Sequence, residues 1–237
     1  MKLSTKYGRK TIEFELTYRN RKTLAIQIQP PDLITVISPW GLSEETIKEK
    51  VSSKGKWIIK KLLDFKDISC IPFKREFVNG ESFMYLGRNY SLNINIDKNL
   101  LRPKVKISDG MLQILSPTKD QDILRVALEK WYKKEAKKII LKRIKFYKTK
   151  FSIEPRQVKI KQQKKRWGSC TPKGNLLFNW KIVMAPSSVI DYIIVHEMSH
   201  LIHKNHSGKF WKLVESVLPD YKDRRKWLKD YGVRMNL

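Results

Sequence analysis

All four histidines of the 237-residue chain lie between positions 196 and 206. Two of them frame His196-Glu197-Met198-Ser199-His200, an HExxH pattern, and residues 189–195 before it are mostly apolar. An apolar approach of this kind predicts a buried helix. Histidines four positions apart share one helical face with about 6 Å of axial rise between them, so both imidazoles can bind one Zn²⁺. The segment therefore predicts a buried helix that carries a zinc site.

Glu197 lies about 100° around such a helix from His196. That position suits contact with a metal-bound water rather than with the metal itself, which predicts a catalytic base. The alternative interpretation of the pattern is a polar helix face that binds no metal. The apolar helix and the additional histidines favour a metal site at His196, Glu197 and His200, whereas His203 fits the polar face.

A third ligand requires a bend in the chain. On a straight helix His206 would lie about 9 Å beyond His200, so the helix must end near His203 and the chain must turn back. Asn205 tolerates the left-handed conformation that such a turn can use. We prefer His206 to His203 because three ligands on one straight helix approach a line rather than tetrahedral corners; Glu215 is the third choice.

The rest of the chain mixes strand and helix patterns. Alternating apolar residues predict strands at 12–18, 24–28, 33–37, 83–86, 90–96, 105–107, 111–115, 158–160 and 176–180. Helical spacing predicts a helix from Ser43 to Leu62, weakened at Gly55, and another over 122–147 whose apolar stripe begins at Ile123. Asp109-Gly110 predicts a hairpin turn. We expect an α+β fold with a β-rich N-terminal part over 1–120 and a catalytic part over 121–237, which can form one continuous domain.

The chain carries a net charge of +27, with 50 Lys and Arg against 23 Asp and Glu. Basic residues concentrate at 133–150 and 159–166, so the basic surface can attract nucleic acid through salt-sensitive phosphate contacts. No segment reaches the roughly 18 apolar residues of a membrane span, and the first residues lack a secretory signal core. Cys70 and Cys170 are too few for a disulfide framework. We expect a cytoplasmic protein with no membrane partner.

Several motifs resemble the YgjP-like metallopeptidases, which are related to the SprT-like zinc peptidases. The matching segments span nearly the whole chain: Arg21-Lys22-Thr23, Asn79-Gly80-Glu81, Tyr85-Leu86-Gly87, Arg166-Trp167-Gly168-Ser169-Cys170, Asn179-Trp180, Ala185-Pro186, Asp191-Tyr192, His196 to Leu201, Asn205-His206-Ser207, Phe210-Trp211 and Pro219-Asp220-Tyr221. The resemblance implies a zincin-like fold, with a twisted β-sheet over an HExxH active-site helix. It also implies zinc on His196, His200 and His206 with Glu197 as the catalytic base, and the family's ligand set does not include His203.

These observations support two hypotheses of different classes. The first is a zinc-dependent metallopeptidase that hydrolyses protein or peptide substrates with a metal-activated water. Glu197 would take the water proton and pass it to the leaving amine. The alternative is a nucleic-acid-associated binding protein with a structural zinc site, which requires four protein ligands.

Several other residues near the pattern are candidates for supporting roles. Trp167 and Gly168 are candidate substrate-binding residues, at a sheet edge that could pair with an extended peptide; packing beside the helix is the alternative interpretation. Tyr192 and Asn205 are candidate donors to a developing oxyanion, and each also fits a structural role. Cys170 as a metal ligand or redox switch is the less favoured interpretation. Residues 210–211 are predicted to pack in the core.

Overall fold

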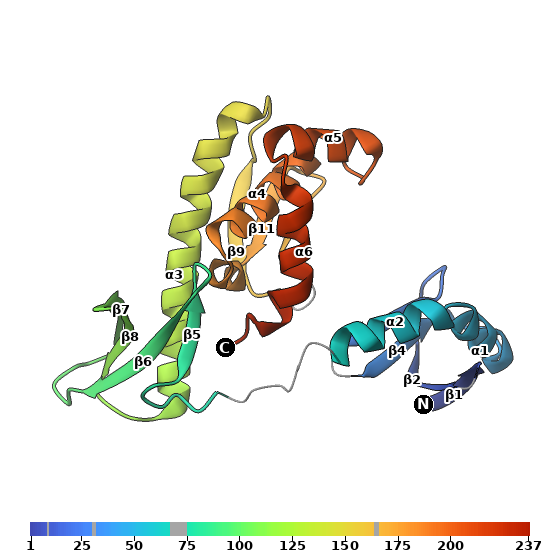
Figure 1. The fold of residues 1–237 in the computed structure, drawn as a ribbon, viewed down its shortest axis with the longest axis horizontal. Helices are drawn as coiled ribbons and strands as arrows, with labels where there is room; N and C mark the ends of the chain where they lie inside the picture. Colours follow the sequence, from blue (N-terminus) through green and yellow to red (C-terminus); the bar gives the residue numbers. More distant parts are fainter. Residues whose placement is uncertain (9, 30–31, 67–74, 164–165) are drawn as a thin grey trace. The chain divides into compact units, whose positions relative to one another are not determined.

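The computed structural model describes residues 1–8, 10–29, 32–66, 75–163 and 166–237. The chain divides into two compact units, Met1–Lys74 and Arg75–Leu237 (Figure 1). Both units combine strands with helices, which confirms the predicted α+β class. No helix of the described residues is long and apolar enough to cross a membrane.

The first unit is a four-stranded sheet accompanied by two helices. The strands are β1 (Lys2–Tyr7), β2 (Lys10–Tyr18), β3 (Ala25–Gln29) and β4 (Leu33–Ser38), in the order β1-β2-β4-β3. β2 and β4 are parallel, and the other neighbouring pairs are antiparallel. Alternation along β2 buries Ile12, Phe14 and Leu16, which form one core with residues of β4 and of the two helices.

The helical pattern over 43–62 forms two helices, α1 (Glu44–Ser53) and α2 (Gly55–Lys66). The Ser43 hydroxyl caps α1 by accepting a hydrogen bond from the Thr46 backbone N–H at 3.2 Å. The predicted weakness at Gly55 is the boundary between them. A Cβ added at Gly55 would lie 2.2 Å from ring atoms of Tyr7, so only glycine allows this approach to β1.

The second unit contains two sheets and the remaining long helices. β5 (Ser82–Tyr85), β6 (Arg88–Ile96), β7 (Lys104–Ser108) and β8 (Met111–Ser116) form one sheet, in the order β5-β6-β8-β7. The predicted hairpin is confirmed: Asp109 and Gly110 both have positive φ and join the antiparallel strands β7 and β8. The second sheet, β10-β11-β9, consists of β9 (Gln157–Lys161), β10 (Gly168–Cys170) and β11 (Asn175–Asn179).

The long helix α3 (Gln121–Tyr147) contacts β7, β8, β9 and α4 (Ser187–Ile202). Its helical prediction is confirmed, but the predicted start of the stripe at Ile123 is wrong, since that side chain is 43% exposed. Six of its seven buried positions are spaced four apart, Leu124, Leu128, Tyr132, Ala136, Ile140 and Ile144, and the seventh, Tyr147, follows three positions later. A spacing of four places each side chain above the previous one on the same face.

The compact units do not divide at residue 120. Strands β5–β8 belong with the later helices, because Phe83, Leu92 and Leu112 of their sheet share one core with Leu124 and Leu128 of α3. The predicted strand over 176–180 also ends earlier. Trp180 begins a 3-10 segment, Trp180–Met184, that leads into α4.

The tip of the β5–β6 hairpin is joined to this 3-10 segment. The backbone N–H of Leu86 donates to the Val183 carbonyl at 2.8 Å, and that of Gly87 donates to the Met184 carbonyl at 3.0 Å. Gly87 has a φ of +78°, and a Cβ there would lie 2.8 Å from Cγ of Pro186. The hairpin therefore braces the chain immediately before α4.

Candidate metal centre

Helix α4 holds the HExxH residues in a buried position. Its sequence is apolar on nearly all sides, and residues 189–195 are all buried. Asp191, on the same helix, forms an ion pair with Arg143 of α3, so this buried carboxylate has a charged partner. Because α4 is packed on several sides, the directions of its histidine and glutamate side chains are fixed by the fold.

Helix α4 ends at the point where the chain must turn back if His206 is to approach His200. The last helical residue is Ile202, and His203 continues in an extended conformation with φ −114° and ψ 108°. Asn205 is not among the residues with positive φ, so the turn does not use the left-handed conformation that asparagine tolerates. The extended conformation at His203 already ends the helix without it.

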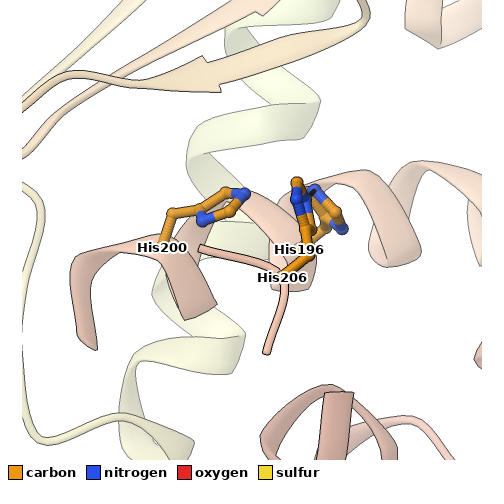
Figure 2. A group of neighbouring side chains, drawn as sticks. All are labelled: His196, His200 and His206. Atoms are coloured by element: carbon orange, nitrogen blue, oxygen red, sulfur yellow. Dashed lines mark hydrogen bonds between the residues drawn. The ribbon is translucent and has the colours of Figure 1, made fainter. Parts of the chain in front are cut away.

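The structure brings His196, His200 and His206 together (Figure 2). Each ring offers one nitrogen, and these three atoms all lie within 4.8 Å of one another. The Nε2 atoms of His196 and His206 are 3.1 Å apart. Two nitrogens bound tetrahedrally to one zinc at about 2.0–2.1 Å would be about 3.3 Å apart. The spacing of the cluster is therefore suited to a metal ion.

The protonation of the rings also fits a metal ligand set. Burial, together with the nearby His200 and His206, lowers the pKa of His196 to about 3, so this ring is neutral at physiological pH. Burial also lowers the pKa of His200. Nδ1 of His200 donates to the His203 backbone carbonyl at 3.0 Å, which leaves Nε2 of His200 free to bind a metal. Nδ1 of His196 is buried and has no partner among the described residues.

Glu197 lies in a buried position beside the histidines. Its side chain is 6% exposed, and burial raises its pKa to about 8, an effect that the positive charge of Arg166 opposes. A Cβ added at Gly168 would lie 2.7 Å from Oε1 of Glu197. The edge strand β10 can therefore approach this carboxylate only because residue 168 is a glycine.

An aromatic stack positions His206, which comes from the loop after α4. Its ring stacks on Trp211 of α5 (Gly208–Val217), with ring centroids 5.6 Å apart and planes at 24°. Trp211 in turn stacks on Tyr221 of α6 (Tyr221–Tyr231), at 5.4 Å and 17°, and the guanidinium of Arg225 lies 4.9 Å from the Trp211 ring. This stack limits the orientations open to His206.

Phe210 lies against all three histidine rings, with centroid distances of 5.0, 4.5 and 4.8 Å, and it is fully buried. The prediction that Phe210 packs in the core is therefore confirmed. The contacts of Phe210 and Trp211 with the histidines were not predicted. The only sequence signal for them is that two aromatic residues follow His206 by four and five positions.

Other candidates lie outside the cluster. The His203 side chain is not part of it, and Glu215 pairs with Lys222 at 3.5 Å. Cys170 does not join the three histidines, and burial raises the pKa of its thiol, which disfavours the reactive thiolate. Cys70 lies outside the described residues.

The substrate-binding and oxyanion candidates differ in their surroundings. Trp167 packs toward Gly232, where an added Cβ would lie 3.1 Å from its ring, so packing accounts for this side chain. Tyr192 is near His196, with ring centroids 5.8 Å apart, and burial raises its pKa to about 12. Asn205 is exposed.

Comparisons with known proteins identify the family of the chain. A sequence model of the YgjP-like metallopeptidase domain matches residues 22–231. Among solved structures, the crystal structure of the metallopeptidase zymogen of Pyrococcus abyssi abylysin is similar over 38% of this chain and 93% of that chain, with 22% identity and a TM-score of 0.35. A search of curated proteins finds no match. Because the domain model covers most of the sequence, including every residue of the histidine cluster, the chain belongs to the YgjP-like metallopeptidase family.

Proposed function

We propose that the protein is a zinc-dependent peptidase in which His196, His200 and His206 hold the metal and Glu197 is the general base. The convergence of three ring nitrogens beside a buried carboxylate carries this proposal. A bound zinc would supply a Lewis acid that polarises the scissile carbonyl and acidifies a water molecule. The family's description as a metallopeptidase domain supports a peptidase.

Glu197 performs the proton transfers in this proposal. A carboxylate oxygen accepts a proton from the attacking water and then delivers it to the nitrogen of the leaving amine. Burial raises the pKa of this carboxyl group, and the positive charge of a bound zinc would oppose that effect and favour the ionised form that accepts the proton. The contact with Gly168 limits the positions open to the carboxylate while it does so.

Strand β10 supplies an edge at which an extended peptide can pair. It is the outer strand of its sheet, with β11 on one side only. A peptide that adds to the free side would form backbone hydrogen bonds with β10, and Gly168 would bring it close to Glu197. In this proposal the role of Gly168 is to let the peptide backbone come close to Glu197. Trp167 has a structural role, since its ring packs toward Gly232.

A structural zinc site is the competing function. Such a site is closed by four protein ligands, whereas a catalytic site retains an open position. Within the part of the chain that the structure describes, the cluster consists of three histidines, and Cys170 does not join it. The ligand count therefore favours the catalytic function.

The test uses the full-length chain loaded with zinc, an unfolded protein substrate and a DNA-bound protein substrate. Glu197→Gln should retain its zinc and lose turnover, while His206→Ala should lose zinc. Glu215→Gln and His203→Ala are the matched controls, since neither side chain is part of the cluster, and both should keep zinc and activity. Turnover by Glu197→Gln, or full zinc binding by His206→Ala, would reject the assigned roles.

A further inference from the structure

A groove in the first unit is lined by none of the residues of the histidine cluster. It has a volume of about 870 Å³ and lies between the start of β3, the segment before α1, and the junction of α1 with α2. Sites for small ligands occupy about 300–1,000 Å³, so the groove is large enough for a ligand with several groups. The proposed peptidase chemistry does not use it.

The floor of the groove is apolar and includes an exposed indole. Leu24, Ile26 and Leu42 line it, and Trp57 of α2 contributes a side chain that remains 44% exposed. Trp40 follows a groove residue, is 72% exposed and stacks on Tyr18 at 5.1 Å. Exposed aromatic side chains offer flat surfaces on which another ring can stack.

Three lysines surround this floor. Lys22, Lys50 and Lys54 line the groove, all are exposed, and none of them forms an ion pair with any described residue. Lys48, on the same helix as Lys50, differs because it pairs with Glu44 at 3.9 Å. The groove therefore joins three uncompensated positive charges to an indole, in a protein whose net charge is +27.

We propose that this groove binds single-stranded nucleic acid, with phosphates on the three lysines and a base stacked on Trp57. Single-strand-binding proteins combine a cationic groove with aromatic side chains in this way. A duplex keeps its bases paired and stacked, so it would leave the indole unused. An acidic peptide would pair with the lysines but has no general requirement for the indole. The proposal is independent of the peptidase function.

The test measures binding of the full-length chain to labelled 12-nucleotide oligothymidylate and oligouridylate by fluorescence anisotropy at several salt concentrations. The logarithm of the association constant falls as the logarithm of the salt concentration rises. Changing Lys22, Lys50 and Lys54 together to Gln should make this negative slope shallower by about 2, at about 0.7 per phosphate contact. That change corresponds to about 100-fold weaker binding at 0.1 M salt, relative to a 1 M reference.

The matched control changes Lys104, Lys106 and Lys119 to Gln. These residues are exposed, belong to the second unit and do not line the groove. The control removes the same charge and should leave the slope unchanged. Equal losses in the two triple variants would overturn the proposal, because binding would then follow diffuse charge.

Variants of Trp57 form the second part of the binding test. Trp57→Ala should weaken binding of both oligonucleotides by about fivefold or more, and Trp57→Phe should restore most of it, because a phenyl ring still stacks. Binding of a glutamate-rich peptide of the same charge should not change with Trp57→Ala. A peptide that binds as tightly as the oligonucleotides, or oligonucleotide binding that does not respond to Trp57→Ala, would overturn the assignment. Thermal melts should show that all variants fold.

Discussion

Replacing Gly168 with Ala tests the contact that positions the proposed base. The added methyl would lie 2.6 Å from Cγ and 2.7 Å from Oε1 of Glu197. Carbon atoms pack at about 3.5–4.0 Å, so the carboxylate or strand β10 must move by about 1 Å. A misplacement of about 1 Å at a reacting group can lower the rate about 100-fold. Overpacking also costs about 1–3 kcal/mol, which corresponds to a fall in Tm of about 2–12 °C.

The assay compares kcat/KM, bound zinc and Tm for Gly168→Ala and for Gly208→Ala. Gly208 begins α5 two positions after His206, and an added Cβ there meets no atom within 4 Å, so this control should match the parent protein. We expect Gly168→Ala to lose about 100-fold in kcat/KM while it keeps its zinc, because no ligand is displaced. Parental activity in that variant, or a parallel loss of zinc, would refute the reasoning.

Three further predictions concern the surroundings of the site. Trp211→Leu removes the stack on the third histidine and should weaken zinc binding about 10–100-fold in competition with a chelating dye; an unchanged affinity would show that the stack is dispensable. Gly87→Ala should lower the free energy of unfolding in urea by more than Gly80→Ala does. Both have positive φ, but only at Gly87 would a Cβ collide with a neighbour. Asp191→Asn removes the negative charge that faces the guanidinium of Arg143, and this change should lower the free energy of unfolding by about 1–3 kcal/mol. The exposed Asp122→Asn should cost less than about 1 kcal/mol, and equal costs would contradict this account.

The sequence predicted those helices, strands and turns that depend on interactions between residues close together in the chain. The period of the apolar residues is sufficient to place α3 and most strands, and Asp109-Gly110 is sufficient to place a hairpin, because positive φ at both turn residues is a short-range requirement. The bend after α4 followed from helix geometry together with the hypothesis that His206 joins the other two histidines. A straight helix could not bring His206 back to His200, and the structure ends α4 at Ile202.

The features that were missed depend on contacts between distant residues. No local pattern shows that a carboxylate at position 197 will meet a backbone at 168, or that Tyr221 will stack on Trp211. The same reason explains the unit boundary. The strand signals over 83–115 read as a continuation of the N-terminal strands, whereas the contacts of their buried side chains with α3 assign them to the second unit.

The pairing of the β5–β6 hairpin with the 3-10 segment bears on how far the protein can be shortened. A fragment that starts at Arg75 keeps both the cluster and the hairpin whose N–H groups at Leu86 and Gly87 satisfy carbonyls before α4. A fragment that starts at Gln121 keeps the cluster but leaves those carbonyls unsatisfied and uncovers one side of α3. We therefore expect the smallest fragment that folds on its own to be larger than the segment that contains the histidine cluster.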